Sequence, residues 1–247
     1  DAPIDILKPE EIAGQELLNS FSDTFGWGRL RNAAILNTRM LLNAMRKTFL
    51  EKGILIEETF DNSRLKNIGS QKRIEYGSEQ YDQVVFCEGY GLKFNPYFNK
   101  IPFDWAKGEA LIIKSPELTG SNPIKHKLMF IPFDNGTFWV GSNYEWEFED
   151  ILPSEETRSM LKKILDDIFR GRYELIEHLA GVRAHAKDRR PVMGHHPLYP
   201  GLVVLNGLGT KGSSQAPLLA KEMADYLLKK SDLSAEVSID RFDRILR

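Results

Sequence analysis

The feature that most constrains this chain is a strand, a glycine-rich turn and a helix over residues 202–229. Residues 202–206 are an apolar run ended by asparagine, which is typical of a buried strand. Glycines follow at positions 207, 209 and 212, and a helix is predicted from about Ser213, with Pro217 near its first turn, where proline is tolerated. This order favours an α/β fold.

The same turn is suited to binding a ligand. A helix start presents unpaired backbone N–H groups and the positive end of the helix dipole, and glycines let that backbone come close to another molecule. Lys211 adds a full positive charge. We therefore predict a site for an anion or for the electron-rich carbonyl edge of a ring. The alternative is a tight connection without a ligand, because neither the phosphate-loop spacing nor a following strand that ends in an acid is present.

Upstream residues make the interpretation specific. Gly-Val-Arg at 181–183, Asp-Arg-x-Pro-x-x-Gly at 188–194, the glycine turn, and Ala-Pro-Leu-Leu-Ala at 216–220 occur in order within residues 181–225. Together they resemble the C-terminal signature of the D-amino-acid oxidase superfamily, which includes glycine oxidase, sarcosine oxidase and the flavin domain of a tRNA-modifying enzyme. Weaker matches, among them Lys107-Gly108-Glu109, extend the resemblance to about residues 27–228.

The resemblance implies a mixed α/β (α+β) fold: a partial FAD/NAD(P)-binding Rossmann-like domain with an antiparallel-sheet substrate-binding domain. We assign residues 1–34 to a linker or substrate-side segment and 35–91 to the FAD domain. Residues 92–180 form the antiparallel domain, and 181–247 return to the FAD domain. Two further helices are expected, one capped by Thr38 with one buried face and one capped by Ser154. Strands are expected at 54–57, 83–87, 110–114, 127–132 and 137–142, and a turn at 134–136 joins the last two. Residues 230–247 are expected to form a polar tail.

The resemblance also implies a cofactor and a chemistry. FAD would accept a hydride from the carbon next to the nitrogen of an amino acid or small amine. Arg183 matches the arginine that binds the substrate carboxylate, and a guanidinium suits two parallel hydrogen bonds. Tyr144, or as second choice Tyr97, would help to hold that carboxylate. The residues that would contact the flavin are Gly89, Gly181, Leu208, Gly209, Thr210, Lys211, Gly212 and Ser213.

One part of the family pattern has no counterpart in residues 1–34, namely the strand, Gly-x-Gly-x-x-Gly turn and helix that cradle the FAD pyrophosphate. We therefore expect a truncated or cleaved chain, the alternative being a protein that naturally lacks this unit. By itself it should bind FAD weakly and lack activity.

Composition excludes several other classes. A single cysteine, Cys87, rules out an intrachain disulfide and fits a cytoplasmic protein, and we take it as a small hydrophobe in a buried strand. No apolar run approaches a membrane span, and the net charge of −2 argues against nucleic-acid partners. The five histidines show no metal-ligand spacing. The expected partner is a small amino acid or amine, and an oligomer stays open.

Two other functions remain as alternatives. One is a flavoenzyme that acts on a larger secondary amine, such as a modified tRNA base. The other is a flavin-free binding module that reuses the substrate sheet of the fold, or a catalytically incomplete fragment.

Overall fold

The structure is a computed structural model that describes residues 4–8, 10–11, 16–22, 25–70, 73–133 and 135–247. It has a mixed α/β fold with several antiparallel sheets, as predicted. By internal contacts the chain divides into unit 1 (residues 1–35 and 107–182) and unit 2 (residues 36–106 and 183–247). The predicted antiparallel domain began at residue 92, whereas residues 92–106 cluster with unit 2.

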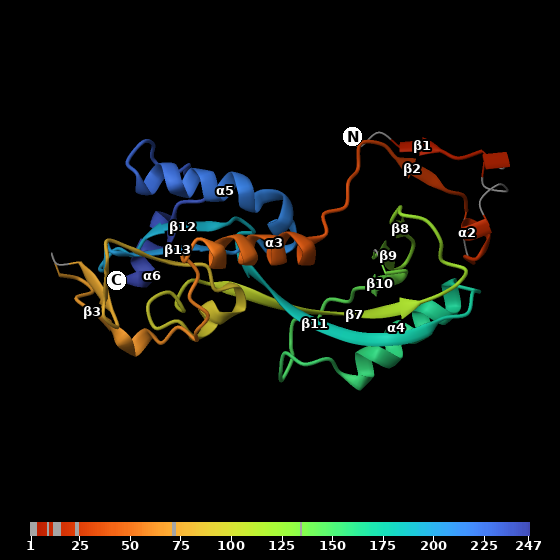
Figure 1. Ribbon diagram of the computed structural model, residues 1–247, viewed down its shortest axis with the longest axis horizontal. Coiled ribbons are helices and arrows are strands. Elements are labelled where there is room, and N and C mark those ends of the chain that lie inside the picture. The colour runs from red at the N-terminus through yellow and green to blue at the C-terminus, as the bar shows by residue number, and fades with distance from the viewer. Residues whose placement is uncertain (1–3, 9, 12–15, 23–24, 71–72, 134) are drawn as a thin grey trace. The chain divides into compact units, whose positions relative to one another are not determined.

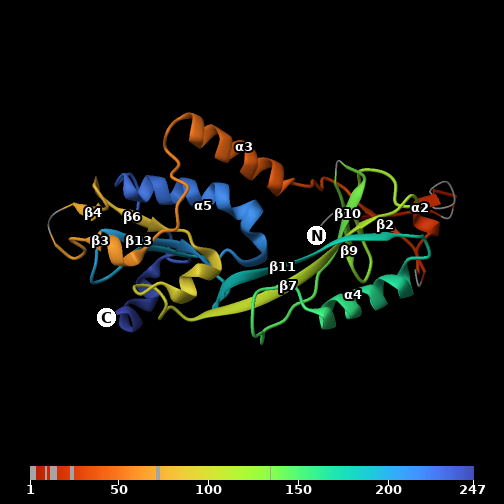
Figure 2. The same cartoon turned by 60° about the horizontal axis from the view of Figure 1, so that its bottom comes forward.

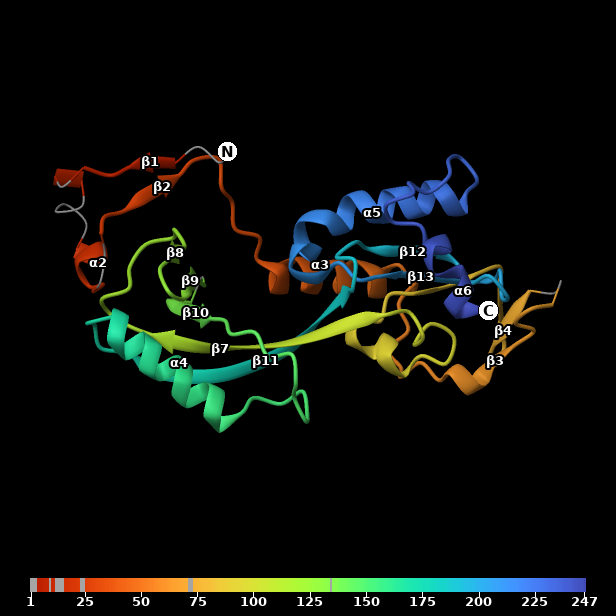
Figure 3. The same ribbon diagram turned by 180° about the vertical axis from the view of Figure 1, so that it is seen from behind.

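Unit 1 is built on a five-stranded sheet in the order β11-β7-β10-β9-β8. Its strands are β7 (Phe103–Lys114), β8 (Ile124–Lys125), β9 (Met129–Pro132), β10 (Thr137–Gly141) and β11 (Glu174–Ala186). β10 pairs antiparallel with both β7 and β9. The long strands β7 and β11 run alongside each other (Figure 3), and the boundaries between the two units fall within them. The predicted turn at 134–136 includes Asp134, which lies outside the described residues.

Helix α4 (Glu155–Ile168) covers this sheet because apolar residues recur along one of its faces. Leu161, Leu165 and Ile168 are fully buried against Leu111, Phe130 and other apolar residues of the sheet. Ser154 caps the helix as predicted, since its hydroxyl oxygen accepts a hydrogen bond from the backbone N–H of Thr157 at 3.2 Å. Unit 1 also contains the short helix α2 (Glu16–Asn19) and a hairpin of β1 (Ile4–Ile6) and β2 (Gly28–Leu30).

Unit 2 is built on the sheet of β12 (Val192–His195), β13 (Leu202–Asn206) and β6 (Val84–Phe86). β13 pairs parallel with β6 and antiparallel with β12. Helix α5 (Gly212–Leu227) lies over one face (Figure 1), where its Leu219 and Met223 pack on Met193 and Val203. The strand–turn–helix unit predicted from residue 202 onward is therefore present.

The opposite face of this sheet is covered by apolar residues from positions 65–103 together with the C-terminal residues. The 3₁₀ turn η4 (Ile239–Phe242) and helix α6 (Asp243–Leu246) bury Ile239, Phe242 and Leu246 in the same core as Val192 and Val204. The prediction of a polar tail at 230–247 is therefore wrong. The apolar residues that contradict it are spaced too widely to stand out among the charged ones.

A smaller meander completes unit 2. It consists of the 3₁₀ turn η1 (Asn62–Arg64) and strands β3 (Leu65–Lys66), β4 (Ile74–Tyr76) and β5 (Glu79–Tyr81), which pair antiparallel in sequence order. The 3₁₀ turn η2 (Gly89–Phe94) follows β6. Cys87, between β6 and η2, is exposed, so the prediction that it is a buried hydrophobe is wrong: β6 ends one residue earlier than expected.

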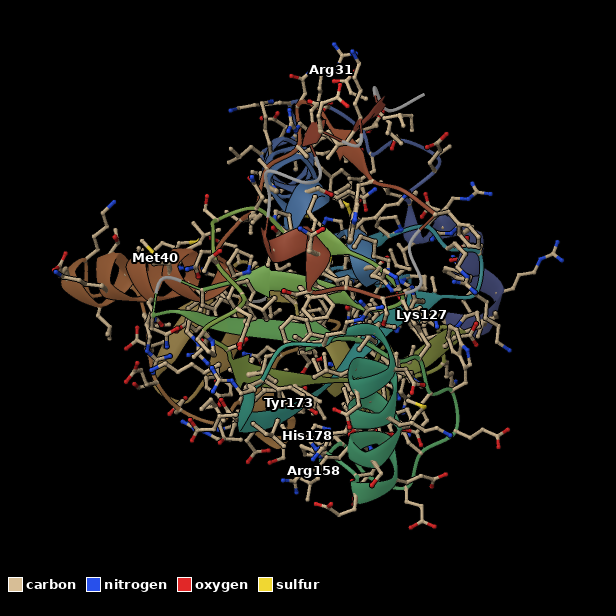
Figure 4. All side chains as sticks on the ribbon, turned by 90° about the vertical axis from the view of Figure 1, so that its right-hand side faces the viewer. Arg31, Met40, Lys127, Arg158, Tyr173 and His178 are labelled. Carbon is tan, nitrogen blue, oxygen red and sulfur yellow. The ribbon has the colours of Figure 1, made fainter. Side chains whose placement is uncertain are left out.

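Helix α3 (Thr38–Glu51) forms where it was predicted but buries none of its residues. Asn37 rather than Thr38 is its cap, accepting a hydrogen bond from the backbone N–H of Met40 at 3.0 Å. Figure 2 shows α3 on the outside of unit 2, beyond α5, and Figure 4 labels Met40 on it. The exposed apolar side chains of α3 are Met40, Leu41, Leu42, Met45, Phe49 and Leu50.

The predicted buried face is therefore wrong within the described structure. Helix-period spacing indicates which face is apolar, but not whether another segment covers it. The strand predicted at 54–57 is also not formed, because a strand needs a hydrogen-bonded neighbour and no described strand pairs with it. No helix among the described residues is long and apolar enough to cross a membrane.

His196 joins two loops of unit 2 in its neutral form. Its Nδ1 accepts the backbone N–H of Leu198 at 3.1 Å, and its Nε2 lies 3.1 Å from the carbonyl oxygen of Tyr97. A neutral ring protonated on Nε2 satisfies both contacts, whereas a second proton on Nδ1 would face the Leu198 N–H. Burial accordingly lowers the pKa of His196 from its ordinary value.

We expect this histidine to make stability depend on pH. The pKa of His196 is lower in the folded protein than in the unfolded chain, so the unfolded chain binds the proton more readily. The contribution of His196 to the free energy of unfolding is therefore complete above about pH 6.5 and is lost as the pH falls toward the folded-state pKa. His196→Gln should therefore destabilise the protein more at pH 8 than at pH 5.5. Urea denaturation at both pH values measures this, and an equal loss at the two would contradict it.

Candidate functional site

The glycine turn of unit 2 is fixed by Asn206, the buried last residue of β13. The side-chain N–H of Asn206 donates to the carbonyl oxygen of Gly89 at 2.9 Å, and its side-chain oxygen accepts the backbone N–H of Gly207 at 2.8 Å. One amide thus connects the end of β13 to Gly89, which lies three residues beyond the end of β6. Gly89 has a φ of +55°, and a Cβ added there would meet nothing within 4 Å.

Two glycines of the turn are required by close packing. Gly207 (φ +80°) and Gly209 (φ +56°) both have left-handed backbone, which favours glycine. A Cβ on Gly209 would lie 2.5 Å from Nδ1 of His185, and one on Gly207 would lie 3.0 Å from the ring of Phe103. The tight connection weighed as an alternative therefore accounts for these two glycines, whether or not a ligand also approaches them.

His185 connects this turn to β11. It forms an isolated antiparallel bridge with Leu208, and its ring lies against Gly209. Arg183 precedes His185 by two residues, so both side chains leave the same face of β11. Burial, followed by the positive charges of Arg189 and Arg183, lowers the pKa of His185, while Asp104 acts in the opposite direction. The structure thus brings Arg183 to the side of the strand that faces residues 208–209.

The start of α5 has no side-chain cap. Lys211 is its N-cap residue and makes no side-chain capping bond, and Thr210, Lys211 and Ser213 are exposed. Gly212 has helical backbone, and the nearest atom to an added Cβ is Cβ of Leu208, at 3.7 Å. The first N–H groups of this helix therefore have no side-chain acceptor from the cap residue, and a helix start of this kind can receive an anion or a carbonyl oxygen.

Two predicted site residues lie in unit 1. Gly181 is exposed in β11, and an added Cβ there would meet nothing within 4 Å. Tyr144 follows β10, is half-exposed, and has its ring 6.2 Å from the ring of Trp146. The carboxylate-binding role of Tyr144 stays a prediction. Tyr97, the second choice, belongs to unit 2, where its carbonyl oxygen contacts His196 and its ring packs on Tyr199.

A buried charged network in unit 1 was not predicted. Glu109 is fully buried, and its carboxylate lies 3.0 Å from Nζ of Lys107 and 2.9 Å from Nε2 of His178. It also accepts the backbone N–H of Ser154 at 2.9 Å and the Ser154 hydroxyl at 3.2 Å. Figure 4 labels His178 beside α4. The sequence singled out Lys107 and Glu109, but Ser154 and His178 lie 45 or more residues from Glu109 along the chain and carry no local signal.

Comparison with known proteins places these features in a family. A family model described as FAD dependent oxidoreductase matches residues 1–226. Among solved structures, glycine oxidase from Geobacillus kaustophilus superimposes with a TM-score of 0.73 at 17% identity, covering 94% of this chain and 64% of that chain. Iminodiacetate oxidase from Chelativorans sp. BNC1 gives a TM-score of 0.77 at 20% identity, covering 97% of this chain and 66% of that one.

A curated relative is similar in sequence. The tRNA 5-methylaminomethyl-2-thiouridine biosynthesis bifunctional protein of Idiomarina loihiensis is 26% identical over 157 residues, which are 58% of this chain and 25% of the relative. The chain therefore spans about a quarter of this relative and just under two thirds of the two solved enzymes.

Proposed function

Because the chain belongs to the FAD dependent oxidoreductase family, we propose that it is the substrate-binding and C-terminal part of an enzyme that oxidises a C–N bond of an amino acid or small amine. The observation that carries this proposal is the arrangement in unit 2 at the start of α5. There a glycine turn in left-handed backbone is bridged to the strand that bears Arg183.

The residues present fit the flavin that the family implies. Within unit 2, a Cβ added at Gly89 would meet nothing within 4 Å, so the backbone there can be approached by a flat ring. The start of α5 presents N–H groups without a capping side chain, next to the positive charge of Lys211. These groups suit a ring edge that carries carbonyl oxygens and gains negative charge on reduction.

Each residue then has a defined task. When bound, FAD supplies the acceptor for the hydride that leaves the carbon next to the substrate nitrogen. Arg183 would hold the substrate carboxylate through two parallel N–H donors and so orient the reacting carbon. His185, kept neutral by burial, would position the glycine turn. Asn206 would hold Gly89 and Gly207 in register.

A second candidate is a flavoenzyme that modifies a tRNA base, which the relative from Idiomarina loihiensis supports. Such an enzyme also oxidises a C–N bond, on a secondary amine attached to a nucleobase. The balanced charge of this chain, −2 overall, counts against extensive contact with a phosphate backbone.

The test is flavin binding by the protein expressed from its complete natural reading frame. After incubation with FAD and gel filtration, we expect flavin absorbance to stay with the protein. Lys211→Glu should weaken FAD binding several-fold, because it places a negative charge at the start of α5. Lys229→Glu, an exposed residue just past the other end of that helix, changes the net charge equally and should not weaken it. A protein that never acquires flavin would favour the flavin-free binding module instead.

A further inference from the structure

Arg241, in η4, connects the C-terminal residues of unit 2 to a turn 50 or more positions upstream. Its Nε donates to one carboxylate oxygen of Asp188 at 2.7 Å, and its Nη2 lies 3.4 Å from the other. The same guanidinium donates to the carbonyl oxygens of Ser238 at 2.6 Å, Pro191 at 2.8 Å and Arg190 at 3.3 Å. A guanidinium can make these contacts together because it carries five N–H donors in one plane.

The turn held in this way joins β11 to β12, and we call it the clamped turn (residues 187–191). Its Asp188 also accepts the backbone N–H of Arg190 at 3.2 Å, and Arg189 donates its backbone N–H to the carbonyl oxygen of Ala186 at 2.8 Å. Arg189 has left-handed backbone, with a φ of +62°, which is unfavourable for a residue that carries a side chain. The contacts from η4 therefore hold a turn whose backbone shape is unfavourable by itself.

The clamped turn begins where β11 meets the glycine turn. The backbone nitrogen of Ala186, the last residue of β11, would lie 3.6 Å from a Cβ added to Gly207. One residue earlier, His185 forms the bridge with Leu208, and its ring lies against Gly209. Because Ala186 directly precedes the clamped turn, a displacement of that turn would also displace these contacts.

The charged groups around His185 come from β11, from β7 and from the clamped turn. Burial lowers the pKa of this histidine, and the positive charges of Arg189 and Arg183 lower it further. Asp104, in β7, acts in the opposite direction. Arg189 belongs to the clamped turn, so a change in that turn would alter both the burial of His185 and the charge beside it.

We propose that Arg241 is a positioning residue for the candidate site: through Asp188 and the clamped turn, it keeps His185 against the glycine turn. The inference rests on the proposed function for the use of that glycine turn, whereas the contacts themselves require no flavin. Arg241 lies beyond residues 1–226, which the family model matches, so the C-terminal segment adds a support outside that match. In this role Arg241 acts through the turn and needs no contact with substrate or cofactor.

The experiment measures the pKa of His185 from its ring C–H signals in NMR spectra of the full-length protein over a series of pH values. All variants are compared in the same state of flavin loading, and a His185→Gln variant assigns the signals. Arg241→Gln should raise the pKa of His185 toward that of an ordinary histidine, because the turn that carries Arg189 is released. The pKa of His196, whose ring contacts other loops, should not change.

Amide hydrogen exchange shows directly whether the clamped turn is released. The backbone N–H of Arg189 is bonded within that turn, and in Arg241→Gln it should exchange about 10-fold faster or more, because charge-assisted hydrogen bonds that hold the turn are lost. Arg241→Lys keeps the charge but not the planar set of donors, so both of its effects should be intermediate. It also serves as the readout should Arg241→Gln fail to fold.

The matched control is Arg247→Gln, which removes the same charge from the same C-terminal segment. It breaks an ion pair with Asp243 in which the arginine is exposed, and both measurements should stay at the parent values. A pKa of His185 that stays at the parent value in both Arg241 variants, whatever the exchange rates, would overturn the proposal. So would equal effects of Arg241→Gln and Arg247→Gln, or equal changes in the pKa of His185 and His196.

The two proposals can fail separately. A protein that never takes up flavin, but in which Arg241→Gln raises the pKa of His185, keeps the positioning role and removes the enzymatic function. A protein that binds FAD, and in which neither Arg241 variant changes that pKa, keeps the proposed function and removes the positioning role.

Discussion

Replacing Glu109 by leucine is expected to destabilise unit 1 by about 3–5 kcal/mol, the usual cost of removing one partner from a buried ion pair. The carboxylate of Glu109 is fully buried and lies 3.0 Å from the Lys107 Nζ, whose own side chain is only 4% exposed. Without Glu109, the acidic partner left to the ammonium group among the described residues is Glu145, whose carboxylate is 3.8 Å away and 35% exposed. A buried charge without a close partner is among the costliest defects in a protein.

The loss extends to α4. Ser154 donates both its backbone N–H and its hydroxyl to Glu109 while its hydroxyl oxygen caps the helix. The carboxylate also lies at the positive end of the helix dipole, where a negative charge is favourable. Glu109→Leu therefore disturbs three elements at once: β7, the start of α4, and β11 through His178.

The measurement is the free energy of unfolding from urea denaturation, with Arg172→Ala as the matched control. That substitution breaks an ion pair with Glu117 in which the arginine side chain is 87% exposed, and it should cost less than about 1 kcal/mol. Glu109→Gln, which keeps the shape, should fall between the two, and it serves as the readout should the leucine variant fail to fold. Losses for Glu109→Leu and Arg172→Ala that agree within error would contradict the assigned role of the network.

The sequence predicted the turn at 207–213 correctly because its signals are local. An apolar run, glycines at close spacing and a proline near a helix start each act within a few residues. The structure adds the reason for two of the glycines, which is contact with His185 and Phe103, and those residues lie more than 20 and 100 positions upstream. Packing across such separations leaves no mark on the spacing of the glycines themselves.

The errors have the same origin. The apolar face of α3 and the strand at 54–57 were inferred from periodicity, which reports what a segment could bury but not what lies against it. Conversely, Ile239, Phe242 and Leu246 are buried by long-range packing although the residues around them are mostly polar. Asn206 and His185, which hold the candidate site together, act through partners that only the fold brings close.

Replacing Arg183 by methionine is expected to lower kcat/KM for substrates with a carboxylate about 30-fold or more in the flavin-loaded protein. This is the effect of losing a charge-assisted contact of roughly 2 kcal/mol. Arg183 shares a face of β11 with His185, whose ring lies against Gly209, and its positive charge is close enough to lower the pKa of that histidine. The Arg183 side chain therefore leaves the same face of β11 as His185, where the proposed contact with a substrate carboxylate would form. Methionine keeps the length of the side chain while removing charge and donors.

Comparison across substrates and variants separates recognition from a structural role. Amines without a carboxylate should be oxidised at nearly the parent rate by Arg183→Met, since they never use the guanidinium. Arg183→Lys keeps the charge but lacks the two parallel donors, so its loss should be intermediate. Lys187→Met removes an exposed positive charge four residues further along the chain and should leave kcat/KM unchanged for both classes of substrate.

Equal losses of kcat/KM on amino acids and on amines would assign Arg183 to the stability of unit 2 rather than to the substrate. Unchanged turnover of both classes would leave the glycine turn without a neighbouring carboxylate site.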